Sequence, residues 1–208
     1  MFFLFCGCAN IVPPTGGAKD VLPPILVDAS PPNLSTNFKT TKIELNFNEY
    51  IKIRELDNIK LSPACDSPPK ILKRGKKIEI LIGCPLDSNT TYTLNFGKSI
   101  VDLNEDNPLT NLKYVFSTGE QLDSLWLGGD VGELYFDEKK PNTLVYLALM
   151  SDSLQSPYYY TFTNNEGRFM LENIKDGNYM IYAIVDENNN FKHDLGELVS
   201  IPEKIEKF

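Results

Sequence analysis

Alternating apolar and polar residues recur along most of this chain. In TKIELNF, residues 41–47, the apolar side chains of Ile43, Leu45 and Phe47 alternate with polar ones. The same alternation recurs in KKIEILIG (76–83), TYTLNFG (91–97) and KYVFSTG (113–119). A period of two residues is typical of strands with one buried face, and no segment shows the period of a helix. The chain is therefore predicted to be all-β.

Turn residues divide the predicted strands into two groups. A polar stretch at Ser117–Ser124, STGEQLDS, follows the first group, and the second group then reads LWLGGDVGELYF, NTLVYLALM, YYYTFTN, GRFMLENI and GNYMIYAIVD. Short strands at this spacing, separated by Pro, Asn and Gly, indicate β-sandwiches. We predict one sandwich over residues 23–119, a linker at 120–124 and a second sandwich over 125–208. The last segment, LVSIPEKIEKF, lacks a closing turn, so the second sandwich is predicted to be truncated there.

The chain begins with an apolar segment that ends in two cysteines, MFFLFCGC. A secretory signal has a basic start and about 7 to 15 apolar residues, and neither feature is complete here. Residues 1–7 are therefore predicted to be the remnant of a signal peptide. The segment Phe5-Cys6-Gly7-Cys8 resembles a bacterial lipobox, although Phe5 stands where Leu is usual. Cys8 is predicted to carry the lipid, and residues 8–22 are predicted to form a flexible tether. The alternative is a disordered end with two incidental cysteines.

Charge and composition exclude two classes of protein. The chain has 20 Lys and Arg against 28 Asp and Glu, a net charge of −8, whereas nucleic-acid binders concentrate Lys and Arg. The one basic run, Lys70–Lys77, is interpreted as a solvated hairpin with its turn at Arg74-Gly75. Apolar residues make up 42% of the chain, but no run approaches the roughly 20 residues that span a bilayer. We predict a globular protein without a nucleic-acid partner.

Residue patterns typical of catalysis are nearly absent. The one histidine, His193, lies beside Asp194 in a polar loop, and no Gly-x-Ser-x-Gly segment marks a nucleophile. A solvated loop histidine is the simpler interpretation. The chain is therefore predicted not to be an enzyme.

Two cysteines remain once Cys6 and Cys8 are assigned to the N-terminal segment. Cys65 follows NIKLSPA and Cys84 follows KIEILIG, which places both at the same end of the first sandwich. An even pair of cysteines in a secreted domain favours a disulfide between Cys65 and Cys84. Two buried reduced thiols are the alternative.

One loop, DENNNFKHDLGE at Asp186–Glu197, has the spacing of a calcium loop. Oxygen-bearing side chains fall at positions 1, 3, 5, 9 and 12, and Ca²⁺ takes about six to eight oxygen ligands. Position 6, where glycine permits a sharp turn, is Phe191. Local hydrogen bonding of Asn and Asp in a turn is the alternative, and it is preferred for the shorter DLNEDNP at Asp102–Pro108. The candidate calcium ligands are Asp186, Asn188, Asn190, Asp194 and Glu197.

Aromatic residues gather at Tyr158–Tyr160, and the single tryptophan is Trp126. Such residues can form a platform on which sugars stack. Successive residues of a strand point to opposite faces, however, so at most two of the three tyrosines share a side. We therefore expect core packing on one face and an ordinary amphipathic surface on the other.

Several motifs of residues 23–119 follow one another in an order typical of a known family. They are the opening Pro-Pro, a strand ending in Phe-x-Glu, Tyr-x-Leu-x-Phe-Gly, Val-Asp-x-Asn-Glu-x-Asn-Pro and the closing Phe-Ser-Thr-Gly. With these motifs the segment resembles the bacterial Ig-like domain of the S-layer SbsA type. The second unit is similar to carboxypeptidase regulatory-like, or prealbumin-like, sandwich domains through Gly128–Val131 and NNEGRFMLENIKDGNYMIYAIVDENNN.

A lipobox, an SbsA-type Ig-like domain and a regulatory-like sandwich occur together in lipoproteins of Bacteroidota. The resemblance implies outer-membrane anchoring and a non-catalytic structural or protein-interaction module. The alternatives are a glycan- or ligand-binding envelope protein stabilised by calcium, and an accessory region of a larger enzyme. The expected partners are the membrane, through the lipid anchor, and other envelope proteins or glycans. Because no acidic residue follows Cys8 before Asp20, the periplasmic face of the outer membrane is favoured over the cell surface.

Overall fold

The computed structural model describes Gly17 and residues 19–65, 67–133, 138–152, 156–188, 190–191, 193–200 and 203–206. Within these residues every regular element is a strand except η1, a 3₁₀ turn at Leu56–Asn58. The prediction of an all-β protein built from sandwiches is confirmed. No helix in this described part has the length and apolar character needed to span a membrane.

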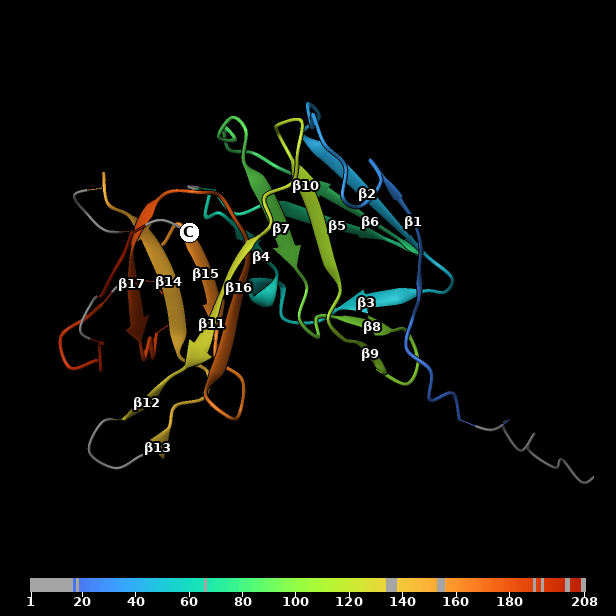
Figure 1. Ribbon diagram of the computed structural model, residues 1–208. Helices are drawn as coiled ribbons and strands as arrows, with labels where there is room; N and C mark the ends of the chain where they lie inside the picture. The colour runs from blue at the N-terminus through green and yellow to red at the C-terminus, as the bar shows by residue number, and fades with distance from the viewer. Residues whose placement is uncertain are drawn as a thin grey trace, which may run out of the picture.

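The first group of strands forms a sandwich of two main sheets and a small third one (Figure 1). Its strands are β1 (Leu26–Ser30), β2 (Lys42–Phe47), β3 (Ile51–Ile53), β4 (Lys60–Ser62), β5 (Lys70–Arg74), β6 (Lys77–Leu81), β7 (Thr91–Asn95), β8 (Ile100–Asp102), β9 (Pro108–Leu109) and β10 (Lys113–Ser117). The four-stranded sheet has the order β1-β2-β6-β5 and the larger three-stranded sheet the order β10-β7-β4. The small sheet has the order β3-β8-β9.

The predicted alternation places the apolar faces of β2 and β6 in the core between the two main sheets. Ile43, Leu45 and Phe47 of β2 are buried, and their polar neighbours face outward. Rings fill the opposite side of this core, where the centroid of Phe116 lies 4.0 Å from that of Phe38 and 5.5 Å from that of Tyr92. Burying one large apolar side chain contributes about 1.5–3 kcal/mol, so these residues are the main source of stability.

Charged side chains cover the outer face of β2 and β6. Glu44 stands directly opposite Glu79, a pairing of like charges that is unfavourable on its own. The ammonium groups of Lys42 and Lys77 lie 2.6 Å and 2.8 Å from the carboxylate of Glu44. Hydrogen bonds, first from Lys42 and then from Lys77, lower the pKa of Glu44 to about 2. The lysines thus relieve the repulsion between the two glutamates.

The basic run at Lys70–Lys77 forms the predicted hairpin. Strand β5 ends at Arg74 and β6 begins at Lys77, so the turn residues are Gly75 and Lys76, one position later than expected. Gly75 has a φ of +65°, a left-handed value that glycine adopts without strain. The turn therefore begins at the glycine and not at Arg74.

The second group of strands forms another sandwich (Figure 1). Its strands are β11 (Leu125–Asp130), β12 (Gly132–Glu133), β13 (Glu138–Lys139), β14 (Leu144–Leu149), β15 (Tyr159–Phe162), β16 (Arg168–Ile174), β17 (Asn178–Ile184) and β18 (Glu203–Glu206). The larger sheet has the order β15-β14-β17-β18, and β11 pairs with β16 to form the second layer. Strands β12 and β13 pair with each other.

The central strand β14 is buried on both faces. On one face Leu147 packs with Tyr159 and Tyr179 in the core shared with β11 and β16. On the other face Tyr146 packs in a separate cluster with Tyr182. The outer sheet face of a sandwich usually meets water, so this second cluster has to be covered by another part of the chain.

The three consecutive tyrosines separate across the strand as the alternation predicts. Tyr159 is only 1% exposed and belongs to the core. Tyr160 lies on the opposite face, where its ring centroid is 5.1 Å from that of Phe191. The expectation of an ordinary amphipathic surface on that side is wrong, because Phe191 of the 186–197 loop and part of the first sandwich pack against it. Trp126, in contrast, is 63% exposed.

A glycine in the turn between β15 and β16 provides a test of the second sandwich. Gly167 has a φ of +75°, and a Cβ at this position would lie 2.7 Å from the carbonyl oxygen of Val131. We expect Gly167→Ala to lower the free energy of unfolding by about 2–4 kcal/mol, because backbone strain and a steric clash add. Gly97→Ala is the matched control, since its φ is +53° but no atom lies within 4 Å, and it should cost only about 1 kcal/mol. Equal losses in urea unfolding would contradict the packing around Gly167.

Candidate functional site

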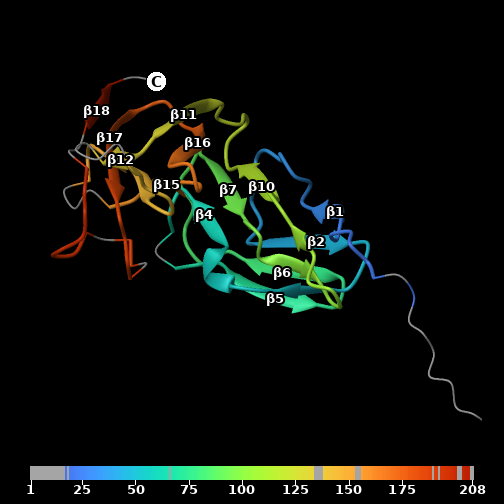
Figure 2. The ribbon, with the colours of Figure 1, turned by 90° about the horizontal axis from the view of Figure 1, so that it is seen from below.

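The two sandwiches meet where two sheet edges face each other. Strand β4 is the outer strand of one sheet, and β15 is the outer strand of another; Figure 2 shows them close together. The backbone N–H of Ala64, just beyond β4, donates to the carbonyl oxygen of Tyr158 at 2.6 Å. The N–H of Tyr160 donates to Oγ of Ser62 at 3.3 Å. Open sheet edges invite aggregation, and here each edge shields the other.

The segment that joins the sandwiches is held against the first one. The N–H of Thr91 donates to Oδ2 of Asp123 at 2.9 Å, and the N–H of Asp123 donates to Oγ1 of Thr91 at 2.7 Å. This reciprocal pair ties residues 120–124, the predicted linker, to the start of β7. The segment is therefore a fixed connection and not a free hinge.

Polar side chains bridge the sandwiches at further points. The hydroxyl of Tyr158 donates to Oδ2 of Asp87 at 2.5 Å. Burial, followed by the bond to this carboxylate, raises the pKa of Tyr158, so the hydroxyl remains a donor. The other bridges are Asn173 to Thr93, Lys175 to the carbonyl of Ser88, and the ion pair of Lys113 with Glu172. These contacts come from several strands and loops, and together they define one orientation of the two sandwiches.

Cys65 and Cys84 form a disulfide, with their Cα atoms 6.1 Å apart. Cys65 follows β4 and Cys84 follows β6, so the bond joins the two main sheets of the first sandwich. Cys65 is also the neighbour of Ala64, whose N–H reaches the second sandwich. The disulfide therefore holds the segment that carries the junction.

A cleft of about 1160 Å³ opens beside the junction. The second sandwich contributes aromatic residues to it, and the first contributes mainly aliphatic residues from the region of η1 to β5. Tyr146 and Tyr182 stack with ring centroids 5.1 Å apart, and Nζ of Lys60 lies 4.4 Å from the ring centroid of Phe191. Concave, largely apolar sites between domains are the usual places for small ligands. This cleft is the candidate binding site.

Lys60 and Tyr146 are two of the polar groups of the cleft that have no hydrogen-bond or ion-pair partner among the described residues. Lys60 makes no ion pair there; burial lowers its pKa, and the more distant carboxylates of Asp57 and Asp186 oppose this effect only in part. The hydroxyl of Tyr146 has no hydrogen-bond partner in the same part of the chain, and burial raises its pKa to about 12. Lys60 and Tyr146 thus place a cation and a neutral hydroxyl within largely apolar surroundings.

The loop at 186–197 is closed by hydrogen bonds among the candidate calcium ligands. Asp186 is buried, and its carboxylate accepts the N–H groups of Asn190 and Phe191 at 3.1 Å and 2.9 Å. The structure connects all five candidate ligands through hydrogen bonds within the loop. Further bonds run from the N–H groups of Glu187 and Asp194 to Glu197, and from the amides of Asn188 and Asn190 to Asp194.

These bonds correspond to the local alternative for an Asn- and Asp-rich turn, and calcium binding stays a prediction. Among the described residues, no group of three or more His, Cys, Asp or Glu side chains is arranged to hold a metal. Phe191, at the position where calcium loops carry glycine, has a left-handed φ of +62°. Its ring lies 5.1 Å and 6.0 Å from the rings of Tyr160 and Phe162, between centroids. Packing on the aromatic face explains why phenylalanine occupies this position.

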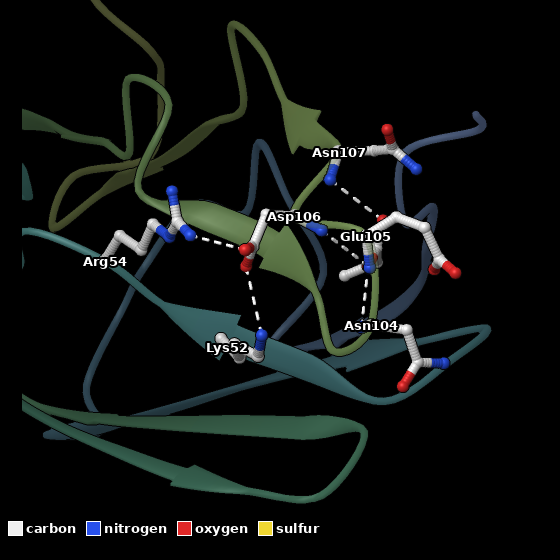
Figure 3. A network of polar contacts seen from close by, with 7 residues as sticks. Lys52, Arg54, Asn104, Glu105, Asp106 and Asn107 are labelled. Carbon is white, nitrogen blue, oxygen red and sulfur yellow. Dashed lines mark hydrogen bonds and ion pairs between the residues drawn. The ribbon is translucent and has the colours of Figure 1, made fainter. Parts of the chain in front are cut away.

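A second polar network surrounds Asp102 at the end of β8 (Figure 3). The buried carboxylate accepts four backbone N–H groups of the following turn at 2.6–3.0 Å. Burial acts to raise the pKa of Asp102, but the four donors outweigh it and keep the pKa below its usual value. The donors are the N–H groups of Asn104, Glu105, Asp106 and Asn107. The segment is organised as a turn, the preferred interpretation of its sequence.

The remaining candidate residues are placed as follows. Cys8, the candidate for lipid attachment, lies outside the described residues, as does Cys6. His193 lines the cleft, and its Nε2 lies 3.2 Å from the carbonyl oxygen of Glu197.

Sequence reasoning does not single out Lys60 or Tyr146. The available signal is TLVYLALM at 143–150, in which both alternating sets of positions are apolar. Such a run indicates a strand that is covered on both faces. The residues that supply the second cover lie far away in the sequence, so the run alone does not identify the cleft.

One family model matches the first sandwich, and two similar solved structures are matched over most of the chain. Residues 20–118 match the family described as bacterial Ig-like domain, so this sandwich is Ig-like. The N-terminal part of the bacterial S-layer protein SbsC is similar at 11% identity and a TM-score of 0.32, over 86% of this chain and 43% of that one. The D00-D0 domain of Intimin is similar at 12% identity and a TM-score of 0.24, over 85% of this chain and 98% of that one. No curated protein shows a significant match.

The chain spans less than half of the SbsC structure that it matches. The activity and partners of the whole protein therefore have to be argued from its own residues.

Loss of the disulfide should destabilise the first sandwich. The bond closes a loop with a sequence separation of 19, and removing such a constraint costs about 3 kcal/mol of unfolding free energy. We expect this loss for the double variant Cys65→Ala, Cys84→Ala in urea unfolding. Reduction of the unmodified protein should lower its stability by a similar amount. A protein whose stability responds to neither change would contradict a structural role for the bond.

Replacing Asp102 by asparagine tests the turn network. In Asp102→Asn, the side-chain amide keeps one acceptor oxygen but turns an NH₂ donor toward the N–H groups of the turn. This change should lower the melting temperature by roughly 5 °C or more at neutral pH. Asp106→Asn is the matched control, because it removes only partly exposed ion pairs to Lys52 and Arg54 (Figure 3), and it should cost about 2 °C or less. Equal shifts for the two variants would show that the four N–H groups do not depend on the carboxylate.

Acidification gives a second readout of the same variant. Because the pKa of Asp102 is lower in the folded protein than in the unfolded chain, its stabilising effect is complete above about pH 5. This effect is lost as the pH falls through the folded-state pKa. The melting temperature of the unmodified protein should therefore fall on acidification. The melting temperature of Asp102→Asn should fall by less over the same pH range. Parallel pH profiles would contradict the assignment.

Proposed function

We propose that this protein is a non-catalytic module of the cell envelope that holds two β-sandwiches in one orientation and presents them to other envelope proteins. The observation that carries the proposal is the junction between the sandwiches. Its edge contacts, the fixed linker and the bond of Tyr158 to Asp87 act together on the same interface. Independent domains joined by a flexible linker need none of these contacts.

Two further observations support an interaction role. The first sandwich matches the bacterial Ig-like domain, a fold that serves many functions and therefore permits this role without proving it. On the second sandwich, Trp126 and Met170 are 63% and 53% exposed. They lie close together over Gly128, where a Cβ would be 3.6 Å and 3.8 Å from their side chains. Exposed tryptophan and methionine are enriched where proteins bind one another.

The N-terminal segment supplies the proposed attachment to the membrane. We propose that Cys8 carries the lipid anchor and that the protein lies on the periplasmic face of the outer membrane. The order of an apolar segment, Gly7-Cys8 and a Pro- and Gly-rich stretch supports this proposal. Several acyl chains on one cysteine anchor a protein stably, whereas a single chain binds only marginally.

Detergent phase partition tests the anchor. Expressed from its full-length gene, the protein should enter the detergent phase, and Cys8→Ser should move it to the aqueous phase because the acylated thiol is lost. Cys6→Ser is the matched control and should leave partition unchanged, since Cys6 precedes the proposed cleavage site. Partition of Cys8→Ser into detergent would contradict lipidation at this residue. Protease added to intact cells should leave the protein uncut, and cleavage would place it on the cell surface.

A further inference from the structure

The cleft beside the junction has two unlike walls. On the second sandwich, Tyr146 and Tyr182 are stacked and only 6% and 8% exposed. On the first sandwich, the wall includes the aliphatic residues Leu56, Ile59 and Ile71. The volume of about 1160 Å³ slightly exceeds the range of roughly 300–1,000 Å³ that is usual for small-ligand sites. The space therefore suits an extended apolar group.

A cation lies within this apolar lining. Lys60 is half-buried and its Nζ lies 4.4 Å from the ring centroid of Phe191, which packs on Tyr160. No ion pair of Lys60 exists among the described residues, and burial lowers its pKa. Lys70 also lines the cleft, while Asp57 places one exposed carboxylate at its rim. The carboxylates of Asp57 and Asp186 offset the burial of Lys60 only in part, and neither forms an ion pair with it, so an anion beside Lys60 would be stabilised.

Hydroxyl donors accompany the cation. Within the described part of the chain, the hydroxyls of Tyr146 and Tyr160 have no hydrogen-bond partner, and burial raises the pKa of both. Neither hydroxyl oxygen is fully buried, and both residues line the cleft, so both oxygens can contact a ligand there. Neutral phenols that keep their protons can donate to an anionic oxygen.

The same burial argues against a sugar as the ligand. Stacking on a sugar requires an open aromatic face, whereas the faces of Tyr146 and Tyr182 are packed against each other. Only the polar edges of such rings remain available. The site therefore favours a ligand whose main body is apolar and whose polar part is a compact anion.

We propose that the cleft binds an amphiphile with an apolar chain and one anionic head, of the long-chain carboxylate class. The chain contacts the aliphatic and aromatic walls. The carboxylate pairs with Lys60 and accepts hydrogen bonds from the tyrosine hydroxyls. This inference goes beyond the structural role proposed above, because the anchor and the junction are complete without a ligand.

Calorimetric titration with dodecanoate below its micelle concentration tests the proposal. The full chain carrying Cys6→Ser and Cys8→Ser is used so that it stays in solution without lipid. We expect saturable binding to one site, and at least about tenfold weaker binding of dodecyltrimethylammonium, which has the same chain with a positive head. Lys60→Gln should weaken dodecanoate binding about tenfold, and Tyr146→Phe about threefold, because each removes one head-group contact.

Matched variants separate this effect from a change in folding. Lys60→Arg keeps the charge and should bind within about threefold of the unmodified protein, and Lys73→Gln removes an exposed lysine outside the cleft and should change nothing. Amide NMR shifts on titration should cluster at Ile59–Leu61, Tyr160 and Tyr182. Absence of saturable binding, equal binding of the cationic amphiphile, unchanged binding by Lys60→Gln, or shifts that cluster elsewhere would each overturn the proposal.

Discussion

The contact between the edges of β4 and β15 is the interaction on which the rest of the arrangement depends. Each strand ends its own sheet, and an unpaired edge would expose backbone donors and acceptors to other chains. The N–H of Ala64 and the carbonyl of Tyr158 satisfy each other across the junction. This bond joins two backbone groups, and a second one runs from the N–H of Tyr160 to Oγ of Ser62. The polar bridges and the fixed linker then restrict the sandwiches to one orientation.

This contact also accounts for the second aromatic cluster. Tyr146 and Tyr182 lie on the face of the sheet that would meet water in an isolated sandwich, yet both are almost fully buried. The 186–197 loop, through Phe191, and the first sandwich cover that face together. The loop and the first sandwich do not fill all the space over this face of the sheet. The space that they leave is the cleft, which Lys60 lines. Junction and cleft are therefore two consequences of the same packing.

The sequence predicts the parts of this structure that depend on local order. The alternation in TKIELNF identifies β2 and its buried face, and the glycine of KRGKK locates a hairpin to within one residue. The cleft depends instead on residues distant in the chain, such as Lys60 and Tyr182, which no local pattern relates. Phe191 is another example: at this position of the loop glycine is expected, and its role is visible only once Tyr160 is beside it.

Residual dipolar couplings of backbone amides test the central claim, that the two sandwiches have one fixed orientation. Couplings from β2, β6, β7 and β10 define the alignment of the first sandwich, and those from β14, β16 and β17 define that of the second. The account predicts that a single alignment tensor fits both sets with the orientation seen in Figures 1 and 2. Two tensors of clearly different magnitude would show independent motion of the sandwiches and would contradict the account.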